Sequence, residues 1–137
     1  AMAGCAGEEP DGRDELTIVS HGGPVRDYVG LVDTLRSMGL AIQPAGTIRQ
    51  PFFGPPASSL TVGDGQIQIF EFPDSNAARS AASRVDPDGR TVGTTMVSWV
   101  ATPHFYRRGR LLVIYVGEEE AARAALRAVL GTPFAGG

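Results

Sequence analysis

Apolar residues recur along this chain with two periods, one typical of helices and one typical of strands. Helical spacing predicts three helices, over residues 25–38, 74–85 and 118–130. Gly39 stands where a helix-ending glycine is expected after the first of them, and Asp74 is the expected N-cap of the second. We therefore expect three helices whose ends are set by local residues.

The third predicted helix carries charges that suit a helix dipole. Glu118, Glu119 and Glu120 lie at its amino-terminal end, where the positive end of the dipole stabilises negative charge. Arg123 and Arg127 lie nearer its carboxyl end. Because Glu119 and Arg123 are four residues apart, we expect an ion pair between them.

Short apolar or alternating segments predict the strands. They cover residues 16–19, 40–48, 60–62, 66–69, 94–100 and 111–116, of which the last two are the most strand-like. Pro44 should confine its strand to an edge or a bulge, and Gly63-Asp64-Gly65 should close a hairpin. The order of elements predicts an α+β domain with an antiparallel sheet of about five strands and the helices packed on one face.

Length and local composition divide the chain into a tail and one domain. Residues 1–15 are charged and rich in glycine, with too little apolar surface to offset the entropy of ordering, so we expect a flexible tether. Residues 16–137 contain the predicted helices and strands and are long enough for a single globular domain.

The overall composition excludes several classes of function. No apolar run reaches the roughly 18 residues that a membrane-spanning helix needs. The net charge of -3 provides no general attraction to nucleic acid. Lysine does not occur, which excludes Schiff-base enzymes and the lysine of a phosphate-binding P-loop.

Motifs of common enzymes and metal sites are absent from the sequence. Two histidines and one cysteine cannot supply the four ligands of an ordinary structural zinc site. Residues 86–89 resemble the start of a calcium loop, but Val97 stands where that loop needs glutamate, so we expect a turn instead. No metal and no cofactor is predicted.

The lone cysteine has informative neighbours. Cys5 follows Ala3-Gly4 and precedes a polar stretch rich in glycine, residues 6–12, as the lipid-attachment cysteine of a bacterial lipoprotein does. The alternative is an unreactive thiol in a flexible tail. Lipidation of Cys5 would hold the domain at a membrane through its tether.

Two aromatic segments are candidate contact surfaces. Phe105-Tyr106 precedes Arg107-Arg108 at a predicted chain reversal, and such a hairpin tip could bind a phosphate, an acidic polysaccharide or a nucleic acid strand. The alternative is a solvated turn. Phe52-Phe53, in the proline-rich loop 50–56, is the second candidate, and here the alternative is a lid folded back on the core.

A wider set of segments carries a family resemblance. The segments are Gln66–Phe72, Asp86–Gly89, Thr94–Val100, Pro103–Tyr106, Gly109–Gly117 and Leu130–Gly136. Together they resemble a family of small uncharacterised bacterial lipoproteins, and Pro103-His104-Phe105-Tyr106 with the apolar strand after it is the most specific part. The resemblance implies a signal peptide, an anchor through Cys5 outside the cytoplasmic membrane and a globular domain of unassigned function. It assigns no catalytic residue.

The expected function is that of a lipid-anchored, extracytoplasmic binding or interaction module without enzymatic activity. Its partner would be an envelope protein or ligand and not nucleic acid, and its only link to the membrane would be the lipid. The partner's identity and the oligomeric state stay open. The expected contact residues are Phe52, Phe53, His104, Phe105, Tyr106, Arg107 and Arg108.

Two alternatives stay open beside that expectation. One is a small extracytoplasmic enzyme that uses His104 as acid or base, with Tyr106 or a carboxylate such as Glu71 brought near it by the sheet. The other is a purely structural envelope protein, which would present neither a pocket nor an aromatic patch.

Overall fold

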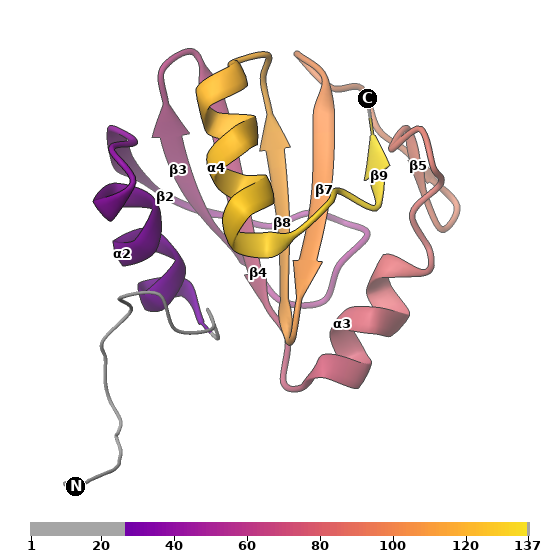
Figure 1. Ribbon diagram of the computed structural model, residues 1–137. Coiled ribbons are helices and arrows are strands. Elements are labelled where there is room, and N and C mark those ends of the chain that lie inside the picture. Colours follow the sequence, from indigo (N-terminus) through magenta and orange to yellow (C-terminus); the bar gives the residue numbers. More distant parts are fainter. Residues whose placement is uncertain (1–26, 137) are drawn as a thin grey trace, which may run out of the picture.

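A computed structural model gives the fold and describes residues 27–136 (Figure 1). The helices are α2 (Tyr28–Ser37), α3 (Ser75–Ala82) and α4 (Glu120–Leu130). The strands are β2 (Ile42–Ile48), β3 (Ala57–Val62), β4 (Gly65–Glu71), β5 (Thr91–Val92), β6 (Thr95–Met96), β7 (Pro103–Arg108), β8 (Leu111–Val116) and β9 (Ala135–Gly136). The predicted tether, its Cys5 and the strand predicted at 16–19 lie outside the described residues.

Six of these strands form one sheet, in the order β2-β3-β4-β8-β7-β9. Every neighbouring pair in it is antiparallel. Strands β5 and β6 form a separate two-stranded ribbon. The predicted α+β class with an antiparallel sheet is confirmed.

Strand β8 lies in the middle of the sheet and is buried on both faces. Its odd-numbered residues, from Leu111 to Tyr115, belong to one hydrophobic cluster. Its even-numbered residues, from Leu112 to Val116, belong to a second cluster. Because side chains alternate between the faces of a strand, a strand covered on both sides appears in the sequence as a continuous apolar run.

Helices α2 and α4 cover the first face of the sheet, as Figure 1 shows. Leu31 and Leu35 of α2 and Leu126 of α4 pack there against the strands in one cluster. The apolar residues of α4 recur at helical spacing along a single stripe, which makes that stripe the buried side of the helix.

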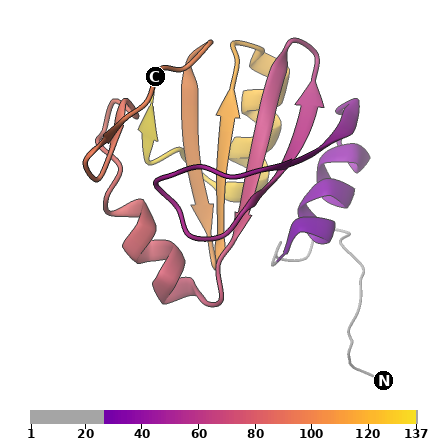
Figure 2. The same ribbon diagram turned by 180° about the vertical axis from the view of Figure 1, so that it is seen from behind.

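Helix α3 packs on the second face, which corrects the expectation that all helices share one face. Ala78 and Ala81 belong to the cluster that contains Phe70 and Leu112. Seen from behind in Figure 2, the segment between β2 and β3 also crosses this face. The second face needs this cover because the central strands are apolar on both sides.

Two predicted helix boundaries are confirmed, the N-cap at Asp74 and the helix end at Gly39, whereas the N-cap at Asp27 was not predicted. The Asp74 carboxylate accepts a 2.8 Å hydrogen bond from the backbone N–H of Ala77, and Asp27 does the same for Gly30 at 2.8 Å. Gly39 has a φ of 94° just after α2, which is the left-handed conformation expected of a residue that ends a helix.

The predicted ion pair between Glu119 and Arg123 is wrong. Arg123 instead lies 3.4 Å from Glu120, three residues before it. Glu119 is the extended N-cap residue of α4, so it lies outside the helical geometry that places residues four apart side by side. Its backbone N–H donates a 3.0 Å hydrogen bond to the hydroxyl oxygen of Tyr115.

The predicted strand at 94–100 is also wrong, because only Thr95–Met96 is a strand there. The strand that pairs with β8 is β7, Pro103–Arg108. The short reversal after β7 places Arg108 opposite Leu111, so the residues immediately before the turn must form the strand. The β-branched composition of 94–100 gave no information about this register.

Strand β2 contains the irregularity that Pro44 predicts. It lies at the edge of the sheet, and its register against β3 shifts between Pro44 and Thr47. An edge accommodates proline because the missing N–H faces no neighbouring strand.

Candidate functional site

His104 is a buried, hydrogen-bonded residue of β7. Only 3% of the surface of His104 is exposed to solvent. Its ring stacks on the ring of Tyr115, with 5.7 Å between the ring centroids. Nε2 lies 3.1 Å from the carbonyl oxygen of Gly117, which can only accept, so Nε2 carries the hydrogen. Burial lowers the pKa of His104, and the imidazole is therefore neutral at neutral pH.

The proposed partnership of His104 with Glu71 is wrong. In β4, Glu71 pairs in register with Leu111 at one end of β8, whereas His104 pairs with Tyr115 near the other end. The Glu71 carboxylate accepts hydrogen bonds from the backbone of Tyr28 and the side chain of Arg110, each at 3.2 Å. Within residues 27–136, no carboxylate is hydrogen-bonded to His104.

Phe52 and Phe53 fold back as a lid on the core. Both are buried, and the Phe53 ring packs edge-on against Phe70 with 4.9 Å between centroids. Phe52 packs against Trp99 at 6.4 Å. The two phenylalanines are therefore not part of an exposed contact surface. Their rings are buried in the hydrophobic cluster on the second face of the sheet.

The aromatic and basic residues of β7 do not form one hairpin tip. Phe105 and Tyr106 are buried on opposite faces of the sheet. Arg107 donates to the Gly109 carbonyl oxygen at 3.1 Å, while Arg108 donates to Val129 at the end of α4 at 2.9 Å. Of the four residues expected at this hairpin tip, only the two arginines remain there. Alternation along β7 buries the Phe105 and Tyr106 rings on opposite faces of the sheet.

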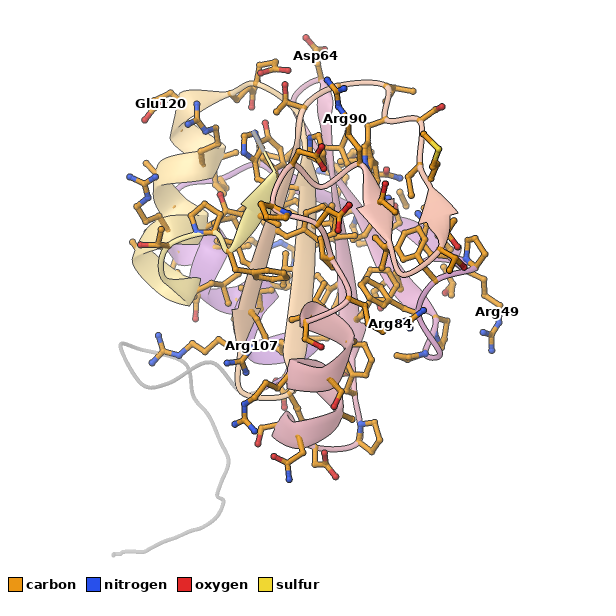
Figure 3. All side chains as sticks on the ribbon, turned by 90° about the vertical axis from the view of Figure 1, so that its right-hand side faces the viewer. Arg49, Asp64, Arg84, Arg90, Arg107 and Glu120 are labelled. Carbon is orange, nitrogen blue, oxygen red and sulfur yellow. The ribbon has the colours of Figure 1, made fainter. Side chains whose placement is uncertain are left out.

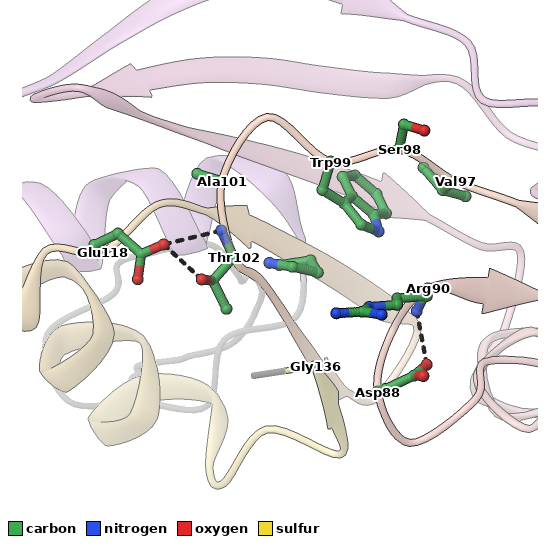
Figure 4. A pocket seen from close by; sticks show the side chains of 10 residues that line it. Asp88, Arg90, Val97, Ser98, Trp99, Ala101, Thr102, Glu118 and Gly136 are labelled. Carbon is green, nitrogen blue, oxygen red and sulfur yellow. Dashed lines mark hydrogen bonds between the residues drawn. The ribbon is translucent and has the colours of Figure 1, made fainter.

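A pocket of about 680 Å³ opens beside Trp99 (Figure 4). The segment between α3 and β7 supplies most of its wall, and the first residue of β7, the connection before α4 and the end of β9 supply the rest. Its lining residues are Asp88, Arg90, Val97, Ser98, Trp99, Ala101, Thr102, Pro103, Glu118 and Gly136.

Trp99 is fixed in this wall by its ring nitrogen and by its neighbours. Nε1 donates a 2.8 Å hydrogen bond to the carbonyl oxygen of Gly89. The indole packs edge-on against Phe105 with 5.9 Å between centroids. These contacts hold the loop on the sheet and leave the indole partly exposed to the pocket.

The two acidic residues of the pocket are already hydrogen-bonded within the protein. Glu118 accepts from the backbone N–H and the hydroxyl of Thr102, at 3.0 and 2.5 Å. These bonds lower the pKa of Glu118. Asp88 accepts from the backbone N–H of Arg90 at 2.9 Å. Both carboxylates are thereby occupied in shaping the pocket wall.

Arg90 is the cationic side chain among the residues that line this pocket. Its guanidinium has no hydrogen bond or ion pair with any residue from 27 to 136, and Figure 4 draws it among the residues that line the pocket, which include Trp99. Figure 3 places Arg90 at the opposite end of the molecule from Arg107. Arg90 and Trp99 therefore form a different surface from the one expected at Arg107 and Arg108.

A second pocket, of about 230 Å³, lies on the other side of β9. Gly136 lines both pockets, while Pro103 lines the first and His104 the second. Adjacent residues of a strand point to opposite faces, so the two pockets open on opposite faces of the sheet. Of the predicted contact residues, His104 and Tyr106 are brought together here.

Other kinds of site were also sought in the described part of the chain. Residues 27–136 contain no group of three or more His, Cys, Asp or Glu side chains that could hold a metal ion. None of their helices is long and apolar enough to cross a membrane.

No protein-family model, curated protein or solved structure matches the chain. The assignment of function therefore depends on the geometry of the two pockets and on the sequence around Cys5.

Sequence reasoning missed Arg90 and Trp99 in the first pocket and the two arginines in the second. The sequence pattern places Trp99 in a regular strand over residues 94–100. Arg90 follows the predicted turn 86–89, and nothing in its sequence neighbours indicates a binding site. Arg123 and Arg127 did carry a readable signal, because like charges four residues apart on a helix repel each other. An anion bound between the two arginines would offset this repulsion.

Proposed function

We propose that this chain is the ligand-binding domain of a lipid-anchored bacterial lipoprotein, and that it binds a small ligand beside Trp99 without converting it. The observation that carries the proposal is that the Arg90 guanidinium, which pairs with no residue from 27 to 136, lines the same pocket as the partly exposed indole of Trp99. An indole offers an apolar face and a guanidinium offers a charge, which together favour a flat apolar ligand with one anionic group.

Binding without chemistry is favoured by the state of the polar groups. A general base must be free to take a proton. Burial lowers the pKa of His104 and makes it a weaker base, and no carboxylate among residues 27–136 is hydrogen-bonded to it. The hydrogen bonds from Thr102 make Glu118 a weaker base than an ordinary carboxylate. The presence of two pockets also counts against a purely structural role.

The lipid anchor is the second part of the proposal. Its support is the lone Cys5 between small residues and a polar stretch, together with the resemblance to bacterial lipoproteins. An anchored domain would meet its ligand or envelope partner on the outer side of the cytoplasmic membrane.

The binding test uses the only tryptophan of the chain, Trp99, as its reporter. The probe is anilinonaphthalene sulfonate, an aromatic anion that matches the chemistry of the pocket. We expect saturable quenching of the Trp99 emission, weaker binding to the Arg90→Gln variant and unchanged binding to Arg79→Gln. Arg79 is a matched control because, among residues 27–136, its side chain bonds only to Asn76 on the same helix, α3. Equal binding by the Arg90 variant and wild type would overturn the placement of the site.

The anchor is tested separately, by membrane fractionation of the natively encoded protein beside a Cys5→Ser variant, with the intact mass of each. We expect the wild type in the membrane fraction with the added mass of acyl chains, and the variant released. A soluble wild type of unmodified mass would overturn the anchor and leave the pocket proposal standing.

A further inference from the structure

The smaller pocket, between α4, β7 and β9, has a one-sided charge. Its lining residues are Pro87, His104, Tyr106, Arg123, Arg127, Pro133, Phe134, Ala135 and Gly136. Two of these are arginines and none is acidic, while His104 is neutral as shown above. The pocket therefore presents two positive charges at a wall that is otherwise uncharged.

The two arginines are held close together with little internal compensation. Arg123 and Arg127 are four residues apart on α4, where like charges repel. Arg123 has one contact with Glu120, at 3.4 Å, and that glutamate is largely exposed. The Arg127 guanidinium has no hydrogen bond or ion pair with residues 27–136. An anion in the pocket would relieve this repulsion.

Tyr106 supplies an independent sign of a ligand. The residue is 1% exposed, and its side chain lines the pocket. Its hydroxyl makes no hydrogen bond with any residue in the described part of the chain. Buried hydroxyls are normally paired, so an unpaired one at a pocket wall indicates a donor kept for a bound group. Arg123 and Arg127 are both close enough to Tyr106 to oppose the rise in its pKa that burial causes.

We propose that this pocket binds a small oxyanion of the phosphate class. The Tyr106 hydroxyl donates to one oxygen, and the guanidinium groups of Arg123 and Arg127 pair with the negative charge. Phosphate fits better than a carboxylate because it carries up to two charges and more than two acceptor oxygens. The site lies on the opposite face of the sheet from Trp99 and does not depend on the function proposed for that pocket.

Isothermal titration calorimetry of the full chain with inorganic phosphate tests the site. Sodium chloride keeps the ionic strength constant, and sodium acetate is titrated as a singly charged comparison. We expect saturable phosphate binding that is tighter than acetate binding. The Arg127→Gln and Tyr106→Phe variants should each bind phosphate about tenfold more weakly, since each loses a charge-assisted hydrogen bond. Arg79→Gln, which removes a charge on α3, should bind like the wild type.

Three results would overturn the proposal. They are the absence of saturable phosphate binding, unchanged affinity in both pocket variants, and acetate binding as tight as phosphate binding. Circular dichroism melting without phosphate establishes that each variant is folded at the titration temperature. Tyr106→Phe keeps the buried ring, so it separates the loss of the hydroxyl from a loss of packing.

Discussion

Trp99 Nε1 donates a 2.8 Å hydrogen bond to the carbonyl oxygen of Gly89, ten residues earlier in the chain. The bond joins the loop after β6 to the turn that follows α3. Gly89 in turn lies against Phe105, which packs on the same indole. The pocket wall is therefore one packed unit in which a turn, a loop and a strand of the sheet support each other.

Trp99→Phe should lower the free energy of unfolding by about 1–3 kcal/mol, because it removes the hydrogen bond and leaves the Gly89 carbonyl without that donor. Urea unfolding followed by circular dichroism measures the change without the tryptophan signal. Met96→Ala is the control, since Met96 lies in the same segment and is 84% exposed. Equal stability of Trp99→Phe and Met96→Ala would contradict the role of the indole bond.

Phe53→Ala should destabilise the protein by about 3–5 kcal/mol, as expected for removing a buried phenylalanine. Phe53 is 5% exposed and contacts the rings of Phe52, Phe70 and Phe72. Val100→Ala is the exposed comparison, because Val100 is 98% exposed. Thermal or urea unfolding of both variants measures whether the Phe53 ring stabilises the core. A Phe53 variant as stable as the Val100 variant would contradict the packing of this ring on the core.

Local residues explain which parts of the fold were predictable. The N-cap at Asp74, the helix end at Gly39 and the bulge at Pro44 each depend on one side chain and its own backbone. Strand β8 was predictable because burial on both faces leaves a continuous apolar run. In each case the physical cause lies within a few residues of the feature.

The remaining features depend on contacts between distant segments. The strand beside β8 is set by the register of a hairpin turn, and no property of residues 94–100 taken alone reveals that Pro103–Arg108 occupies that place. The pockets are even harder to predict from the sequence, because Gly136 and His104 become neighbours only when β9 pairs with β7. His104 and Tyr106 were predictable as a motif, and Arg123 and Arg127 as charges on one helix, but only the tertiary structure brings the two pairs into one pocket.

Gly89→Ala should destabilise the protein more than Gly109→Ala does. Both glycines have positive φ, 74° and 57°, so each alanine costs roughly 1–2 kcal/mol of backbone strain. At Gly89 an added Cβ would also lie 2.9 Å from the Phe105 ring, whereas at Gly109 nothing lies within 4 Å. The difference in urea unfolding free energy between the two variants measures this close approach, and equal losses would contradict it.

The buried His104 should make stability depend on pH in a defined window. Burial is the largest cause of its lowered pKa, and Arg123 acts in the same direction, whereas the Gly117 carbonyl and Glu118 oppose it. The unfolded chain therefore takes up a proton near the ordinary value of 6.5, and the folded protein does so only at lower pH. The contribution of His104 to the free energy of unfolding should therefore be constant above about pH 6.5. It should decrease as the pH falls from there toward the lowered pKa of the folded protein.

The His104→Gln variant isolates this effect, since glutamine can still donate to Gly117 but does not titrate. We expect the stability of the wild type, relative to that of the variant, to decrease between about pH 7 and pH 5.5 in urea unfolding experiments. All other titratable groups are common to the two proteins, so the comparison reports on residue 104 alone. Glu118 has a pKa lowered from 4.5, so its contribution falls below this window. Parallel stability curves for the two proteins would mean that His104 is protonated as easily in the folded state as in the unfolded chain.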